Sequence, residues 1–135
     1  MVELACEGEP RFEVSRLEEN TAPSYSVDTI GKVRAGLRAE DELFFIIGAD
    51  AFAEIGTWRR WQEVARAVCF LVVSRPGHSY DVPAGVRFQR LDSVSLDVSS
   101  SHIREQLSRG GCPEDVPESV LAYIVEHGLY GLRTA

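Results

Sequence analysis

The chain has 135 residues, of which 44% are apolar, so it is long and apolar enough to form the core of one ordinary domain. Its 21 acidic residues outnumber its 14 basic residues and give a net charge of −7. This balance argues against nucleic acid as a partner, and any bound nucleotide must meet a local cluster of donors. The longest apolar run covers residues 67–73, far below the roughly 20 residues that span a bilayer, so we expect no membrane partner.

The cysteines and the first residues indicate the compartment. Cys6, Cys69 and Cys112 are far apart and odd in number, which argues against both a disulfide framework and a zinc site. The start of the chain is acidic and lacks the basic residues and apolar stretch of a signal peptide. We therefore expect a cytoplasmic protein with no metal held by protein ligands.

Apolar periodicity predicts helices and strands in alternation. In chain order, the pattern predicts a helix end over residues 2–5, a short strand over 12–14, a helix capped by Ser26, an apolar strand over 43–47, a helix capped by Thr57, an apolar strand over 68–73, one or two short strands within 86–96, a helix that starts at 99–101, and a last helix after Pro117. Strands that are apolar on both faces and alternate with helices belong to parallel sheets. We expect one α/β domain over residues 1–135.

Open parallel sheets bind ligands at the carboxyl ends of their strands, and three segments are expected there. Gly48 and Asp50 follow the first apolar strand. A glycine lets a ligand approach the backbone, and an aspartate can accept two hydrogen bonds from a ribose diol, although Asp50 can also serve only as a helix cap. Arg75 follows the second apolar strand, either as a ligand-binding guanidinium or as a solvated turn residue.

The third segment is the serine run 99–101 with Arg104. Backbone N–H groups and hydroxyls at a helix start form an anion site, and an arginine one turn later can hold a phosphate with two N–H groups. The alternative is an ordinary serine cap with a surface arginine.

Aromatic residues and histidines carry weaker signals. Residues 23–26 can offer backbone N–H groups and the Tyr25 ring ahead of a helix. Trp58 and Trp61 fall on one helical face, a pattern that more often indicates core packing than a ligand platform. None of the three histidines has a metal-ligand partner at a useful spacing.

Five segments, taken in order, resemble the bacterial nicotinate-nucleotide adenylyltransferases. They are PSYSVDTI (23–30), FFIIGADAF with TW (44–58), VVSRPG (72–77), VSSSHIR (98–104) and VPESVLAYIVEHGLY (116–130). The SSxxIR helix start is shared by the wider adenylyltransferase superfamily, whereas the PSY and GxD…TW elements point to the nicotinate branch. The resemblance implies a Rossmann-like nucleotidyltransferase fold. It also implies transfer of AMP from ATP to nicotinate mononucleotide, which forms deamido-NAD and pyrophosphate in NAD biosynthesis.

The resemblance implies roles for residues on the ATP side. Gly48 and Asp50 match the GxD that holds the adenosine ribose. The second phosphate-binding motif is matched by Ser99, Ser101, Ile103 and Arg104, and Arg104 is the catalytic residue because it neutralises the triphosphate. Ser101 replaces the commoner threonine and keeps its hydroxyl. Mg²⁺ is expected to arrive with ATP and bridge its phosphates, with no dedicated protein ligand.

The resemblance implies a second set of roles on the mononucleotide side. Trp58 matches the tryptophan that stacks on the pyridine ring, which leaves Trp61 a core role. Tyr25 and Ser26 match the segment whose backbone receives the nicotinate carboxylate, and Arg75 matches a loop residue near the substrate.

One family element does not occur in these 135 residues. The family's enzymes begin with a strand and a GxFxPxHxGH loop whose histidines hold the triphosphate, and no such loop is found here. We expect a partial domain without the first βα unit, with an unpaired sheet edge and exposed apolar surface, and little catalysis by residues 1–135 alone.

Two alternatives stay open. One is a non-catalytic nucleotide-binding remnant, and the other is a different adenylyltransferase of the superfamily, such as one for phosphopantetheine. Trp58 and the PSYS segment argue against phosphopantetheine. A homo-oligomer is also compatible with the sequence.

Overall fold

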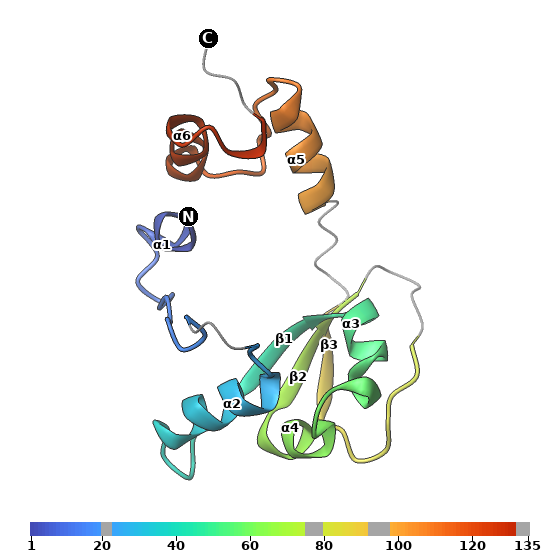
Figure 1. The fold of residues 1–135 in the computed structure, drawn as a ribbon. Helices are drawn as coiled ribbons and strands as arrows, with labels where there is room; N and C mark the ends of the chain where they lie inside the picture. The colour runs from blue at the N-terminus through green and yellow to red at the C-terminus, as the bar shows by residue number, and fades with distance from the viewer. Residues whose placement is uncertain (20–22, 75–79, 92–97, 132–135) are drawn as a thin grey trace. The chain divides into compact units, whose positions relative to one another are not determined.

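The computed structural model describes all residues except 20–22, 75–79, 92–97 and 132–135 (Figure 1). The chain forms two compact units. One is Arg16–Ser95, here called the sheet unit, and the other combines Met1–Ser15 with Leu96–Ala135 and is here called the helical unit. The single domain expected over residues 1–135 stays a prediction.

A parallel sheet of three strands, in the order β1-β2-β3, lies at the centre of the sheet unit. The strands are β1 (Phe44–Gly48), β2 (Cys69–Val73) and β3 (Phe88–Leu91). The register pairs Ile47 with Val72 and Val72 with Arg90. The parallel α/β arrangement predicted from the two apolar runs is confirmed.

The helical segments of the sheet unit follow in chain order. They are α2 (Ser26–Ala35), α3 (Ala49–Ala53), the 3₁₀ helix η1 (Ile55–Thr57) and α4 (Trp61–Ala67). Their apolar residues form one core with the sheet, in which Phe52, Ile55, Val64, Phe70 and Val72 are fully buried. The Phe52 and Phe70 ring centroids lie 5.3 Å apart. This core fixes the ends of β1 and β2, where the site was expected.

The two faces of the sheet differ in burial. Residues alternate between the faces of a strand, so Ile47 and Val72, which are paired, both face the core. On the other face of β1, Phe44 is 42% exposed and Ile46 is 69% exposed. Burial on both faces, expected for the first apolar strand, is therefore wrong for β1, which is an edge strand within the described sheet.

The helical unit contains α1 (Val2–Cys6), α5 (Ser100–Ser108), α6 (Glu118–Glu126) and the 3₁₀ helix η2 (Leu129–Gly131). Leu107, Val120 and Ile124 form its buried core, and Leu4 packs against them. The Ser119 hydroxyl also donates a hydrogen bond to the Leu4 carbonyl at 3.2 Å. These contacts join α1 to α6, two elements far apart in the sequence.

Two local predictions are wrong. Residues 12–14 form no strand, and Phe12 is 65% exposed, since alternation alone cannot hold a strand without a paired neighbour. Thr57 does not cap a helix: its hydroxyl donates to the Glu54 carbonyl at 2.7 Å and it ends η1. Thr57 is also too far from the next helix to cap it, because α4 begins at Trp61 and its N-cap is Arg60.

The described residues include no helix with the length and apolar character that a bilayer crossing requires.

Candidate functional site

A pocket of about 310 Å³ opens between the start of α2 and the segment that follows η1. It is lined by Ser24, Tyr25, Ser26, Thr57, Trp58 and Arg59. The two lining segments are distant in sequence, and the packing of α2 against α4 brings them together. Three residues expected to share a ligand, Tyr25, Ser26 and Trp58, thus line one pocket.

The α2 side of the pocket is a helix start. Tyr25 is the N-cap in an extended conformation, and its carbonyl accepts the N–H groups of Asp28 at 2.9 Å and Thr29 at 3.1 Å. Ser26, expected to be the cap, is the first helical residue instead, a shift of one position that is common at helix ends. The first N–H groups of a helix have no intrahelical acceptor and favour anions. This wall of the pocket suits a carboxylate or phosphate.

Trp58 connects the pocket to the core. It is half-buried, packs against the core of the sheet unit, and meets the Phe45 ring edge-on with centroids 6.0 Å apart. The core and platform interpretations of Trp58 are therefore geometrically compatible. Trp61 also packs against this core, as expected, and is not among the residues that line the pocket.

Arg59 was missed by the sequence reasoning. Its guanidinium carbon lies 4.6 Å from the centroid of the Tyr25 ring, on which it stacks as a cation–π pair at the pocket. Its position directly after Trp58 was the available signal. The sequence alone does not distinguish Arg59 from Arg60 as the residue at the pocket.

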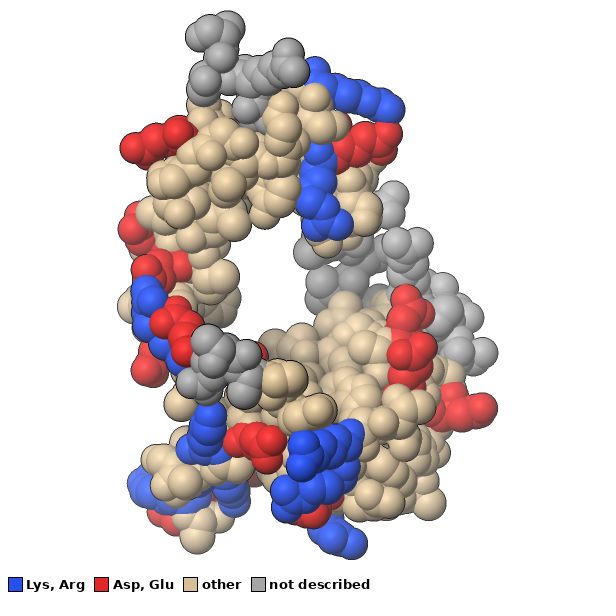
Figure 2. Space-filling model, in the orientation of Figure 1, with Lys and Arg blue, Asp and Glu red and all other residues tan. Residues whose placement is uncertain are grey.

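Arg60 has different partners. It adopts the left-handed conformation, with φ of 52°, just before α4. Its guanidinium donates to the two carboxylate oxygens of Glu63 at 2.8 Å and 2.6 Å, and Asp28 lies 4.0 Å away. The hydrogen bond from Arg60 holds the pKa of the Glu63 carboxyl below its ordinary value. Figure 2 shows such neighbouring basic and acidic side chains over α2 and α4.

The end of β1 carries the expected GxD residues. Gly48 is the last residue of β1, and, apart from Gly48 and its chain neighbours, no atom of the described residues lies within 4 Å of the position that a Cβ would occupy there. Asp50 is exposed in the first turn of α3, whose N-cap is Gly48. The cap role considered for Asp50 is therefore wrong, because α3 already begins at Ala49 and Asp50 lies inside its first turn.

The serine run opens α5 in the helical unit. Ser99 is the N-cap, and its carbonyl accepts the Ile103 N–H at 2.9 Å. The Arg104 guanidinium donates to the Ser101 hydroxyl at 3.2 Å, so these two phosphate-binding candidates lie side by side. Ile103 packs against the buried core of the helical unit and anchors this turn.

The expected site residues fall in different parts of the chain. Arg75 lies outside the described residues. The motif at 99–104 belongs to the helical unit, and Tyr25, Ser26, Gly48, Asp50 and Trp58 belong to the sheet unit. Within the described parts of both units, His, Cys, Asp and Glu side chains form no group of three or more suited to a metal ion.

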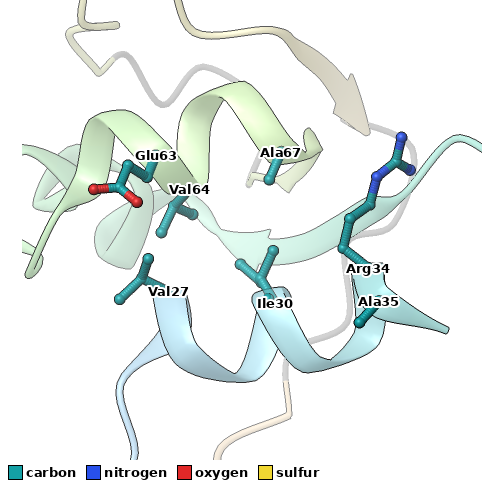
Figure 3. Close-up of a pocket in the computed structure, with 8 residues that line it drawn as sticks. Val27, Ile30, Arg34, Ala35, Glu63, Val64 and Ala67 are labelled. Atoms are coloured by element: carbon teal, nitrogen blue, oxygen red, sulfur yellow. The ribbon is translucent and has the colours of Figure 1, made fainter. Parts of the chain in front are cut away.

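A second pocket, of about 300 Å³, lies between α2 and α4. Figure 3 shows Val27 and Ile30 of α2 pointing toward Val64 of α4. Arg34 and Glu63 add charge to this mainly aliphatic lining. None of the expected site residues lines it, so it is a groove between packed helices and not the expected site.

Curated relatives cover nearly the whole chain. The chain is 64% identical over 130 residues to the probable nicotinate-nucleotide adenylyltransferase of Solibacter usitatus, across 96% of this chain and 69% of the relative. The corresponding protein of Geobacillus thermodenitrificans is 42% identical over 137 residues, across 100% of this chain and 62% of the relative. The corresponding protein of Thermus thermophilus is 40% identical over 132 residues, across 96% of this chain and 70% of the relative. The chain thus spans roughly two thirds of these relatives. No protein-family model matches it.

Solved structures give the same fold. Plasmodium falciparum nicotinic acid mononucleotide adenylyltransferase complexed with APC aligns with a TM-score of 0.68 and 18% identity, over 90% of this chain and 65% of that one. The same protein complexed with NaAD aligns with a TM-score of 0.67 and 19% identity, over 89% and 63%. The Rossmann-like nucleotidyltransferase fold expected from the sequence is confirmed.

Proposed function

Since the chain belongs to the nicotinate-nucleotide adenylyltransferase family, a family of nucleotidyltransferases, we propose that it acts in the transfer of AMP from ATP to nicotinate mononucleotide in NAD biosynthesis. The products are deamido-NAD and pyrophosphate. The observation that carries the proposal is the pocket in which Tyr25, Ser26 and Trp58 meet. Its aromatic wall and helix start suit a flat ring that bears a carboxylate.

Nicotinate mononucleotide is assigned to this pocket. The backbone at Tyr25 and Ser26 receives the carboxylate, since the first N–H groups of α2 have no acceptor within the helix. Trp58 stacks on the pyridine ring, and its contact with Phe45 at 6.0 Å holds the indole in place. Arg75 is assigned to the same substrate on the resemblance alone.

On the resemblance alone, the ribose of ATP is assigned to the end of β1 in the sheet unit, and its phosphates to the start of α5 in the helical unit. The open space at Gly48 admits a nucleotide close to the backbone, and the Asp50 carboxylate accepts hydrogen bonds from the ribose. Ser99, Ser101 and the N–H groups of the turn ending at Ile103 bind phosphate oxygens. Arg104, held 3.2 Å from the Ser101 hydroxyl, neutralises the negative charge that develops on the phosphates.

The reaction is an in-line displacement. A phosphate oxygen of the mononucleotide attacks the α-phosphorus of ATP, a new P–O bond forms, and the bond to the β-phosphate oxygen breaks so that pyrophosphate leaves. The protein mainly positions the two substrates and stabilises charge. Arg104 does this for the leaving phosphates, while Trp58 and the start of α2 fix the attacking nucleotide.

A divalent metal fits this site as a companion of ATP. The guanidinium and N–H groups at 99–104 are donors that contact phosphate oxygens and not cations, so the phosphates themselves would supply most of the ligands of Mg²⁺. When bound, the ion supplies further charge neutralisation on the phosphates. Cytoplasmic location and association into homo-oligomers stay predictions.

Calorimetric titration of the purified chain tests the proposal. We expect saturable binding of nicotinate mononucleotide and of ATP, and no binding of 4′-phosphopantetheine. Binding of 4′-phosphopantetheine in place of the mononucleotide would contradict the proposal and support the other adenylyltransferase. Binding of ATP alone would support the nucleotide-binding remnant.

A further inference from the structure

The neighbouring residues Arg59 and Arg60 have unlike partners. Arg60 is held by the Glu63 carboxylate at 2.6 Å, with Asp28 at 4.0 Å. Among the described residues, no carboxylate lies within 4.0 Å of the Arg59 guanidinium nitrogens, and the guanidinium carbon lies 4.6 Å from the centroid of the Tyr25 ring. In a chain with 21 acidic residues, this leaves a cation at the pocket whose charge is not neutralised by a described carboxylate.

Stacking leaves the hydrogen-bonding capacity of Arg59 intact. A guanidinium interacts with an aromatic ring through its face, whereas its five N–H donors lie in its plane. The Tyr25 ring therefore orients the group without using its donors. Because Arg59 and Tyr25 line the same pocket, these donors are available to an acceptor that enters it.

The charge of the guanidinium matters for the choice between two related substrates. The start of α2 carries only the partial positive charge of a helix N-terminus, so it favours a carboxylate over a neutral amide only modestly. A full positive charge favours a carboxylate over an amide, because the attraction between two opposite charges is added to the hydrogen bond.

We propose that Arg59 determines specificity in this pocket: its guanidinium, positioned by the Tyr25 ring, recognises the carboxylate of nicotinate mononucleotide and disfavours the amide of nicotinamide mononucleotide. The inference rests on the proposed function and adds to it a residue and a selectivity. Nicotinate and nicotinamide mononucleotide share the ribose phosphate, so the ratio of their affinities isolates the carboxylate contact.

The test titrates the purified chain with both mononucleotides by calorimetry. Arg59→Gln should weaken the binding of nicotinate mononucleotide about tenfold or more, because a charge-assisted hydrogen bond is lost. The same substitution should change the affinity for nicotinamide mononucleotide less than about twofold. Arg59→Lys should keep part of the selectivity because it retains the charge. Arg60→Gln is the matched control, one residue away, and should leave the affinity ratio unchanged. Melting curves monitor folding of each variant.

Each contrary result has a distinct meaning. If Arg59→Gln weakens both mononucleotides equally, the guanidinium serves the shared ribose phosphate or the pocket structure, and the inference is wrong. Unchanged affinity for nicotinate mononucleotide in Arg59→Gln also overturns it, with the proposed function intact. If the wild-type chain binds neither mononucleotide, both the proposed function and this inference fail.

Discussion

Trp58 belongs both to the core of the sheet unit and to the lining of the pocket. Its indole packs against Phe45 with centroids 6.0 Å apart and also lines the pocket. Trp61, three residues later, packs against the same core and does not belong to the pocket lining. The pair therefore separates loss of stability from loss of binding.

We expect Trp58→Ala and Trp61→Ala both to lower the free energy of unfolding by about 1–3 kcal/mol, since each side chain is partly buried in the core. Only Trp58→Ala should weaken the binding of nicotinate mononucleotide, by about tenfold or more, because stacking on an aromatic ring contributes about 1–3 kcal/mol per base. Melting curves and calorimetric titrations of the two variants measure these effects. If Trp58→Ala melts early but binds the mononucleotide normally, Trp58 has a core role alone.

Arg104 is the corresponding residue on the ATP side. Arg104→Ala removes the guanidinium next to the Ser101 hydroxyl, and we expect ATP to bind about ten times more weakly or worse, as a charge-assisted hydrogen bond contributes about 1.5–3 kcal/mol. Arg109→Ala on the same helix is the control, because Arg109 pairs with Glu105 at 2.6 Å. Titration with ATP measures the affinity of both variants. If Arg104→Ala binds ATP as tightly as Arg109→Ala and the wild type, the phosphate role of Arg104 is ruled out.

Residue roles at the pocket were only partly predictable. The resemblance to the family predicts roles for Tyr25, Ser26 and Trp58, and the structure adds that these three residues line one pocket. Arg59 could not be found in this way, because the residue pair 59–60 is two identical side chains in the sequence. The left-handed backbone of Arg60, with φ of 52°, is a conformation that residue type does not predict for an arginine.

At the scale of elements, the strongest patterns gave the most accurate predictions. The apolar runs at β1 and β2 and the serine run at α5 carry strong local signals, and the observed bounds lie within one residue of those expected. The predictions for residues 12–14 and for Thr57 were wrong for different reasons. A strand needs a paired neighbour, which the local pattern does not reveal, whereas Thr57 ends η1 and the next helix begins only at Trp61.

The turn between α2 and β1 is an element held by charge. The Asp41 carboxylate accepts the Arg38 guanidinium at 2.9 Å and the Arg38 backbone N–H at 2.9 Å. The side-chain hydrogen bond from Arg38 lowers the pKa of the Asp41 carboxyl below its ordinary value, and the backbone hydrogen bond adds a smaller effect in the same direction. A carboxyl with a lowered folded-state pKa adds stability above its unfolded pKa and loses it as the pH falls through the folded value.

We therefore expect Asp41→Asn to melt below the wild type at pH 7, and the difference to shrink as the pH falls below about 3.9, the unfolded aspartate pKa. Added salt should also reduce the difference, because the pair is at the surface. Glu40→Gln, which removes a longer 3.7 Å contact to Arg38, should have a smaller effect. Melting temperatures across a pH series measure both variants, and a difference that grows toward low pH would contradict this role of Asp41.

At the scale of the whole molecule, the 135 residues contain the proposed substrate contacts but not the family's histidine loop. The 135 residues hold three histidines and no GxFxPxHxGH sequence. Electrostatic stabilisation of the transferring phosphate is usually the largest contribution to catalysis.

We expect residues 1–135 alone, with ATP and nicotinate mononucleotide, to give no more than trace turnover in a pyrophosphate-release assay. Turnover of about 1 s⁻¹ or faster, the ordinary enzymatic range, would show that the histidine loop is dispensable. Calorimetric binding of both nucleotides by the same sample is the positive control, because it separates an inactive chain from a misfolded one.

The exposed face of β1 also affects how the purified chain behaves at high concentration. Phe44 and Ile46, at 42% and 69% exposure, flank a strand edge that can template pairing with another copy. We expect dynamic light scattering to show concentration-dependent aggregation, reduced by Ile46→Lys because a charged side chain on an edge strand opposes strand addition. The same substitution should leave binding of nicotinate mononucleotide unchanged, since Ile46 lies outside the pocket lining. Equal aggregation of the wild type and of Ile46→Lys would show that the exposed face of β1 does not drive self-association, and would direct solubility engineering to other surfaces.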